Sequence, residues 1–310
     1  MQLAPIGICT YSRIDHLKQT IDALQKNTLA QESELYIFSD APQKNDEELV
    51  AKIREYIDTV DGFKKVHIVK RETNGRVANN RGGYQWLLEK YGKAIFLEDD
   101  IVTAPGFLQY MNDALKFYEK DDNVLTISGY CPPFKVPKGL HDDVFILQRH
   151  SSWGSATWGK KLNLFNLELV DHDFKEFLKD EKALKKFQKN GSDMLPMCIK
   201  DFKGELDALD VKLMYYQFKY NKYSLYPRKS LVQNIGHDGT GLHCGKTNRF
   251  YHKELWSKTH NFKFIRDIKV NKSIQKSNYN FRSGGFKGLV VKVIKKIGAY
   301  PILKKIKGQS

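Results

Sequence analysis

The chain has 310 residues, of which 41% are hydrophobic, and its formal net charge is +15. The hydrophobic content is ample for a folded core, and no stretch approaches the ~18–20 apolar residues of a membrane-spanning helix. The four cysteines show no CxxC spacing, which argues against a zinc knuckle or a disulfide scaffold and favours a reducing, cytoplasmic setting.

The positive charge is concentrated at the C-terminal end. No acidic residue follows Asp267, and the last 43 residues carry ten lysines and Arg282. These eleven charges leave only +4 of the +15 for residues 1–267. A nucleic-acid-binding body is therefore not indicated.

Strand-like and helix-like segments alternate through the first 130 residues, and the chain begins close to a strand, so we expect no signal peptide. Apolar runs predict strands at 5–10, 35–39, 65–70, 94–98 and 124–128. Helical spacing predicts helices at 13–27, 45–59, 79–91 and from Pro105 to Tyr118. This alternation predicts an α/β fold with a mostly parallel central sheet and helices on both faces.

The pattern loosens after Tyr130. A strand is expected at 144–148, an aromatic and glycine-rich loop at 153–159, helices at 173–189 and 205–220, and a polar, glycine-rich segment at 233–245.

The most informative motif is Glu98-Asp99-Asp100, which directly follows the apolar run Ile95–Leu97. In open α/β sheets, ligands bind at the carboxyl ends of strands. Clustered carboxylates there suit Mg²⁺ or Mn²⁺, which usually bridge to substrate phosphates. Side-chain alternation would place Glu98 and Asp100 on one face and Asp99 on the other. A solvated acidic turn is the alternative interpretation.

Several further segments occur in the order found in a known family. They are residues 5–13 (PIGICTYSR), Ser39-Asp40, 74–76 (NGR), 79–82 (NNRG), the acid triplet, 153–159 (WGSATWG), 209–211 (LDV) and 234–243 (NIGHDGTGLH). Together, over about residues 3–250, the chain resembles nucleotide-sugar glycosyltransferases of the GT-A fold. It is most similar to the bacterial family-2-type sugar transferases and, distantly, to N-acetylglucosaminyltransferase I.

The resemblance implies roles in the nucleotide-binding half. Asp100 would hold Mn²⁺ or Mg²⁺, while Glu98 or Asp99 would reach the ribose or orient bound water. His243, at the end of a glycine-rich loop, could contact the metal or phosphate, and His237 and Asp238 are weaker candidates for the same role. Asp40 would contact the uracil base of a UDP-sugar. The other candidates for nucleotide contacts are Thr10, Tyr11, Arg13, Arg76, Asn80 and Arg81. Guanidinium groups suit this task because they pair with phosphate in a bidentate way.

In the acceptor half, an inverting displacement needs one carboxylate as general base toward the acceptor hydroxyl. Asp210 is the first candidate, and Asp207, one helical turn earlier, is the second. A retaining reaction would not need this base. Trp153 and Trp158 could stack on sugar faces, although buried structural roles are the alternative.

These features predict a catalytic domain at 1–265, with a nucleotide-binding half at about 1–130 and an acceptor-binding half at 131–265. Residues 266–310 would form a basic amphipathic tail. Within it, 286–307 interleave apolar residues with lysines, which suits the anionic inner face of a cell membrane. We therefore expect a cytoplasmic, peripherally bound enzyme acting on a glycan or lipid-linked acceptor in bacterial surface polysaccharide synthesis.

Two rival functions remain open. A sugar nucleotidyltransferase also places acids around Mg²⁺, but it needs a Gly-rich, basic loop after the first strand, where this chain has Cys9–Arg13. A non-enzymatic membrane- or nucleic-acid-binding protein would instead depend wholly on residues 268–310.

Overall fold

A computed structural model of the chain describes residues 2–137, 140, 142–162, 173–240 and 245–283. The strands are β1 (Ile6–Thr10), β2 (Glu34–Ser39), β3 (Lys65–Lys70), β4 (Lys93–Glu98), β5 (Ile101–Thr103), β6 (Val124–Ser128), β7 (Val144–Leu147), β8 (Ser155–Trp158), β9 (Tyr223–Pro227) and β10 (Val232–Asn234). The α-helices are α1 (Ile14–Gln25), α2 (Glu47–Ile57), α3 (Arg76–Tyr91), α4 (Phe107–Phe117), α5 (Gly159–Leu162), α7 (Glu181–Phe187), α8 (Met194–Phe202), α9 (Leu209–Lys219) and α10 (Lys272–Arg282). Two 3₁₀ helices are η1 (Ala30–Glu32) and η2 (Gln188–Asn190).

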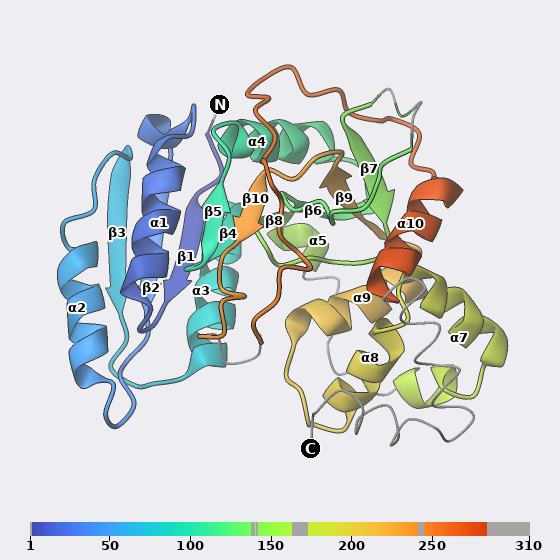
Figure 1. Cartoon of the computed structure of the whole chain (residues 1–310), viewed down its shortest axis with the longest axis horizontal. Helices are drawn as coiled ribbons and strands as arrows, with labels where there is room; N and C mark the ends of the chain where they lie inside the picture. Colours follow the sequence, from blue (N-terminus) through green and yellow to red (C-terminus); the bar gives the residue numbers. More distant parts are fainter. Residues whose placement is uncertain (1, 138–139, 141, 163–172, 241–244, 284–310) are drawn as a thin grey trace.

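Eight strands form the main sheet in the order β3-β2-β1-β4-β8-β6-β9-β7, and β5 pairs with β10 in a separate two-stranded ribbon (Figure 1). The pairs β3-β2, β2-β1, β1-β4 and β6-β9 are parallel. The expected mostly parallel α/β sheet is therefore confirmed. Because β8 lies antiparallel between β4 and β6, the two halves of the chain share one sheet.

Alternation of side chains along the first strands supplies two cores. Ile6 and Ile8 of β1 join the large core with Leu17 and Ile21 of α1. Cys9, on the opposite side of the same strand, packs in a second cluster together with residues of α3. Helices thus cover both faces, as the periodicity predicts.

The acceptor half departs from the predicted elements in several places, since α8, β9 and β10 were not expected. The segment 153–159 is not wholly a loop, because Ser155–Trp158 forms β8. The helix expected at 173–189 is interrupted at Asp180, whose carboxylate accepts hydrogen bonds from the backbone N–H groups of Lys182 and Ala183 and caps α7. An N-cap of this kind starts a new helix rather than continuing an old one.

A separate helical cluster contains α7, α8 and α9 and lies beside the sheet (Figure 1). The helix α10 packs on the sheet side through Ile274, which is fully buried with Phe145, Leu147 and Tyr226. The described part of the basic tail is therefore packed on the domain, and residues 286–307 lie outside the described residues. Among the helices of the described segments, none is both long and apolar enough to cross a bilayer.

Candidate active site

The acid triplet lies at the carboxyl edge of the parallel strands. β4 ends at Glu98, and its parallel neighbour β1 ends one residue past the partner of Glu98, at Thr10. β2 ends at Ser39, paired with Thr10, and is followed by Asp40. The topology therefore brings together polar residues that are as much as 90 positions apart in sequence, at the edge where α/β proteins bind ligands.

Arg13 neutralises two of the three acids. Its Nη2 donates to Asp99 Oδ1 at 2.5 Å and to Asp100 Oδ2 at 2.8 Å. The Thr10 hydroxyl also donates to Asp99, at 3.3 Å. The expectation that Asp99 points away from Asp100 is wrong, because β4 ends at Glu98 and strand alternation does not extend through the following turn.

Asp100 is held from the other side by the segment after β10. The backbone N–H of Ile235 donates to the Asp100 carbonyl at 2.9 Å. Gly236 lies so close that a Cβ built on it would be 2.1 Å from Asp100 Oδ2. Asp100 Oδ1 is buried and has no hydrogen-bond partner among the described residues. A buried carboxylate oxygen without a partner is costly, and a bound cation would offset that cost.

His237 supplies a second unpartnered group. Both of its ring nitrogens are buried and lack a hydrogen-bond partner in the described part of the chain. Burial lowers the pKa of His237, against the opposing charge of Asp100, so the ring is neutral and able to bind a metal. Trp153 and Phe250 fix the ring, with centroids 5.2 and 5.0 Å away.

These two residues fit a divalent cation of the kind that takes few protein ligands and completes its shell with phosphates. No group of three or more acids, histidines and cysteines gathers as a complete metal site within the described segments. His243, the predicted second ligand, lies outside the described residues. His237, which stands in the same NIGHDG segment, is therefore the histidine that the structure brings near Asp100.

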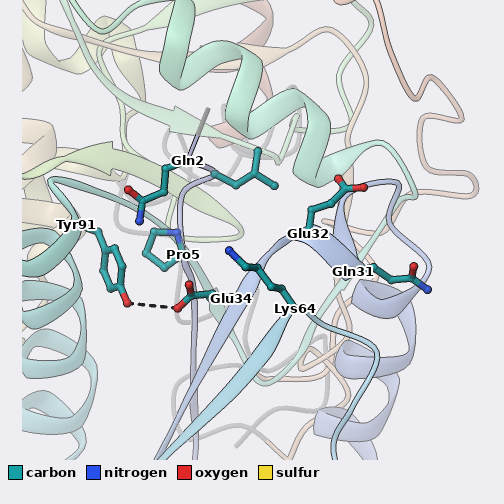
Figure 2. A pocket seen from close by; sticks show the side chains of 8 residues that line it. Gln2, Pro5, Gln31, Glu32, Glu34, Lys64 and Tyr91 are labelled. Carbon is teal, nitrogen blue, oxygen red and sulfur yellow. Dashed lines mark hydrogen bonds between the residues drawn. The ribbon is translucent and has the colours of Figure 1, made fainter.

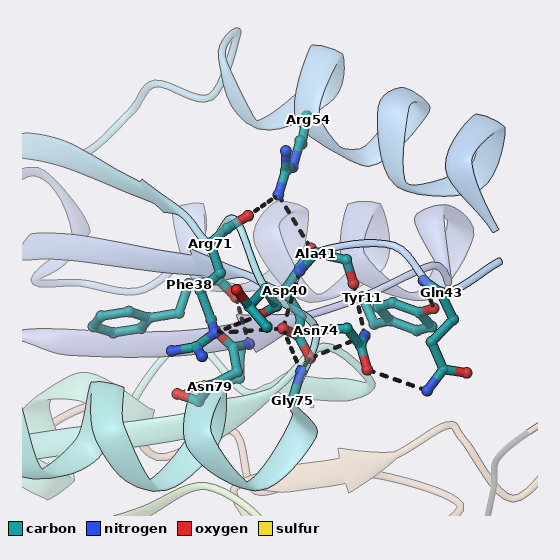
Figure 3. A network of polar contacts seen from close by, with 12 residues as sticks. Tyr11, Phe38, Asp40, Ala41, Gln43, Arg54, Arg71, Asn74, Gly75 and Asn79 are labelled. Atoms are coloured by element: carbon teal, nitrogen blue, oxygen red, sulfur yellow. Dashed lines mark hydrogen bonds and ion pairs between the residues drawn. The ribbon is translucent and has the colours of Figure 1, made fainter.

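The Asp40 carboxylate is largely occupied by its own chain (Figure 3). Both oxygens accept from the backbone N–H of Gly75 at 3.1 Å, and Oδ1 also accepts from that of Ala41 at 3.0 Å. Asn74 and Arg71 approach it at 3.5 Å. Asp40 thus holds the turn before α3, and a uracil base would have to share this carboxylate.

Tyr11, the next residue after β1, lies at the same end of the site (Figure 3). Its hydroxyl donates to Asp46 at 2.6 Å and accepts from the backbone N–H of Gln43 at 2.9 Å. The Tyr11 ring is thereby fixed beside the turn that follows Asp40.

The remaining predicted nucleotide contacts come from α3. Arg76 opens the helix and is exposed, and Asn80 is half-buried. Arg81 instead forms an ion pair with Asp207. This pair joins the nucleotide half to the segment before α9, and it engages both a predicted phosphate ligand and the second candidate base.

Glu98 faces the acceptor half. Burial and the negative charges of Asp100, Asp99 and Asp210 raise the pKa of the Glu98 carboxyl to about 7, although a hydrogen bond from Ser152 opposes the shift. Asp210 stands in the first turn of α9, where the helix N-terminus favours a negative charge. Burial raises the pKa of Asp210, partly offset by the positive charge of Arg149. A carboxylate with a raised pKa is suited to accept a proton.

The two tryptophans predicted to bind the acceptor differ in how far their rings are buried. Trp153 is partly exposed and packs edge-to-face on Tyr130 and Phe250 beside His237. Trp158 is only 4% exposed, and its indole N–H donates to the Leu115 carbonyl at 3.2 Å. Trp158 therefore belongs to the core, and the structure leaves no free ring face on which a sugar could stack.

A pocket of about 360 Å³ lies elsewhere, at the amino edge of the sheet (Figure 2). It is lined by Gln2 and Pro5 before β1, Glu34 at the start of β2 and Lys64 before β3. This is the opposite end of the strands from Thr10 and the acid triplet. The acid triplet does not contribute to this pocket.

Residues that sequence reasoning missed are Arg149, Gly236 and Ser152. Arg149 is 4% exposed and pairs through two parallel hydrogen bonds with Asp193, at 2.9 and 2.7 Å. No sequence signal links these two residues, which are 44 positions apart. Gly236 could have been found only by knowing which carboxylate it approaches.

The match to a known protein family agrees with this architecture. Residues 6–163 match glycosyl transferase family 2, whereas no curated protein matches the chain. Among solved structures, S. aureus TarS is 14% identical, with a TM-score of 0.35, over 53% of this chain and 30% of TarS. The mannosyltransferase PcManGT from Pyrobaculum calidifontis, in complex with GDP-Man and Mn²⁺, is 13% identical, with a TM-score of 0.37, over 53% of this chain and 46% of that protein.

The chain thus spans less than half of the length of either of these structures. The family match covers β1 through β8 and includes the acid triplet with Thr10 and Arg13, but not the segment after β10 that holds Asp100 from the other side. Since this match extends over half of the sequence, the chain belongs to glycosyl transferase family 2 and has the GT-A fold.

Proposed function

We propose that the protein is a metal-dependent glycosyltransferase that transfers a sugar from a nucleotide-sugar to a hydroxyl group of a glycan or lipid-linked acceptor. The observation that carries this proposal is the pair of buried, unpartnered groups on Asp100 and His237 beside a cluster of acids. When bound there, Mn²⁺ or Mg²⁺ would neutralise the charge that develops on the departing diphosphate. UDP is the expected nucleotide, on the strength of the position of Asp40.

Arg13 is placed to contribute twice. It bridges Asp99 and Asp100 and compensates part of their charge. Its guanidinium also lies at the end of β1, beside Thr10, where the family resemblance places the nucleotide. A cation on Asp100 would free part of the guanidinium to donate to the diphosphate.

Asp210 is the proposed general base of an inverting reaction. It is partly buried and close enough to Glu98 for its charge to raise the pKa of that carboxyl, which supports a place at the reacting edge. Asp207 is exposed and already paired with Arg81, and its position supports the role less well. Trp153 forms the wall beside His237 and is the proposed acceptor-stacking residue.

Membrane association through residues 286–307, on the inner face of the cell membrane, remains a prediction from the sequence. It would bring the enzyme to a lipid-linked acceptor during surface polysaccharide synthesis.

Calorimetric titration of the full chain with UDP, GDP and CMP, each with and without Mn²⁺, tests the proposal. One nucleotide should bind in a Mn²⁺-dependent manner, and Asp100→Ala should abolish that binding. Asp113→Asn is the matched control. The Asp113 carboxylate accepts a hydrogen bond from Gln109, one turn earlier in α4, and is not part of the acid triplet. Absence of binding by all three nucleotides would refute the proposed activity.

A further inference from the structure

A second group of charges, of which one is buried and two are partly buried, lies on the acceptor side of the site and is not used by the proposed transfer. Its centre is the ion pair of Arg149 with Asp193, next to which lies the guanidinium of Arg282 at the end of α10. Gly191 permits this approach. A Cβ on it would lie 2.5 Å from Arg149 Nη1, 2.6 Å from Asp193 Oδ1 and 3.5 Å from Arg282 Cβ.

The cluster carries excess positive charge. Asp193 uses both carboxylate oxygens on Arg149. Arg282 forms no salt bridge with any residue that the structure describes. Its Nε atom is buried and has no hydrogen-bond partner there. Burial and the like charge of Arg149 lower the pKa of Arg282 to about 10, which means that its charged form is poorly compensated.

Arg282 is nevertheless held in place. The Arg249 guanidinium donates to the carbonyl of Phe281 and, at 3.1 Å, to that of Arg282, so it caps the end of α10. The Arg282 guanidinium also lies over the rings of Phe250 and Phe281, at 5.8 and 5.5 Å from their centroids. A partly buried cation fixed this firmly, whose neighbouring carboxylate on Asp193 is already paired with Arg149, is costly unless a ligand supplies a further negative charge.

A second donor without a partner lies beside it. Tyr130 is fully buried, and its hydroxyl has no hydrogen-bond partner in the described structure. Burial raises the pKa of Tyr130, and the positive charge of Arg282 is the largest opposing influence, which places the two side chains close together. An anionic ligand that accepts hydrogen bonds from the Arg282 guanidinium and the Tyr130 hydroxyl would give each of these groups a partner.

The cluster borders the reaction site. Phe250, which stacks with Arg282, is 5.0 Å from His237 on its other side, and Trp153 packs on both Phe250 and Tyr130. Arg149 also acts on the charge of Asp210. The uncompensated charge is therefore on the acceptor side of the aromatic wall, next to the proposed base.

We infer that Arg282 and Tyr130 form a subsite for an anionic group, a phosphate or a carboxylate, on the acceptor. The inference rests on the proposed function, because it assigns the acceptor of that reaction to the class of negatively charged glycans. The acceptor hydroxyl would then be oriented toward Asp210 by an anion held at Arg282, which would disfavour neutral glycans that leave the guanidinium uncompensated.

Titration of the full chain with inorganic phosphate tests the subsite without knowledge of the acceptor. Wild type should bind phosphate, and Arg282→Gln should bind about tenfold more weakly or worse, since a hydrogen bond to a charged group is lost. Tyr130→Phe should weaken binding by about tenfold as well, and it removes only a hydroxyl. It therefore keeps the test valid if Arg282→Gln does not fold.

Tyr110→Phe is the matched control. Tyr110 is also fully buried with an unpartnered hydroxyl, but its ring packs against Phe262 and Phe264 in the main core. Phosphate affinity should not change in this variant. Equal affinities in wild type, Arg282→Gln and Tyr130→Phe would overturn the inference.

An Arg13→Gln variant separates this subsite from the diphosphate site. Loss of phosphate binding in Arg13→Gln together with its retention in Arg282→Gln would assign the anion to the donor and overturn the inference. Nucleotide titrations of wild type report on the proposed function separately. A protein that binds nucleotide while phosphate binding is insensitive to Arg282 would disprove the subsite alone.

Discussion

Gly236→Ala should disable the metal site without altering a charged residue. A Cβ at this position would lie 2.1 Å from Asp100 Oδ2 and 2.8 Å from Arg13 Nη1, whereas real Cβ contacts essentially never fall below 3.0 Å. The backbone cannot open easily, because Ile235 donates to the Asp100 carbonyl and Asn234 pairs with Ile101 in the ribbon of β5 and β10. The carboxylate itself must therefore move by about 1 Å.

A displacement of that size at a reacting centre typically costs about 100-fold in function. We expect Mn²⁺-dependent nucleotide binding, measured by calorimetry, to weaken by about 100-fold in Gly236→Ala. Overpacking should lower the free energy of unfolding by only ~1–3 kcal/mol, so the variant should still fold.

Gly245→Ala is the control for this prediction. A Cβ at Gly245 meets nothing within 4 Å in the described part of the protein, and its backbone does not need the left-handed region. Nucleotide affinity in Gly245→Ala should equal that of wild type. Wild-type affinity in Gly236→Ala, measured with Mn²⁺ present, would show that the Asp100 carboxylate does not serve the metal.

Three further predictions follow from burial and pairing. Asp210→Asn should lower turnover by about 10²–10⁴-fold with nucleotide binding retained, whereas Asp207→Asn, which loses an exposed ion pair, should change turnover less than about threefold in the same assay. Burial lowers the pKa of His150 from 6.5 to about 4, so protons favour the unfolded state as pH falls through this interval. When the pH is lowered from 7.5 to 5, the free energy of unfolding of wild type, measured with urea, should fall by ~2 kcal/mol more than that of His150→Gln. An equal fall in both proteins would contradict the lowered pKa of His150. Trp158→Ala should lower the free energy of unfolding by ~3–5 kcal/mol, as measured by the same unfolding experiment, and a near-neutral effect would show that the ring is not part of the core.

The sequence was sufficient to predict the nucleotide-binding half because its elements depend on local patterns. The apolar run before Glu98 becomes β4, and the four-residue spacing of Ile53 and Ile57 places both in the core. In contrast, β8 depends on pairing with β4 and β6, which are distant in the chain, and the alternation in its Ser-Ala-Thr-Trp sequence spans only four residues. Such long-range pairing is invisible to a local pattern.

The site was predictable in its residue types but not in its pairings. The acid triplet and Arg13 were expected at the edge of the sheet, and the structure joins them directly. The pairing of Arg81 with Asp207, across 126 positions, could not be read from either residue, because each alone resembles a surface charge. His243, which follows three glycines, was preferred to His237 as a ligand, and only the fold brings His237 near Asp100.

The buried charges on the two sides of Trp153 are unbalanced in opposite senses. On the nucleotide side, Asp99 and Asp100 share one guanidinium, Glu98 lies beside them without an ion pair among the described residues, and Asp100 keeps an unpartnered oxygen. On the other side, two guanidinium groups share the carboxylate of Asp193. Uncompensated buried charge opposes folding, so its retention on both sides is best explained by ligands of opposite sign. A cation at the donor and an anion on the acceptor would each remove one imbalance, and each would stabilise the fold by mass action when it binds. The preference for an anionic acceptor and the requirement for a metal would therefore have the same physical cause, which is buried charge that the protein itself does not compensate.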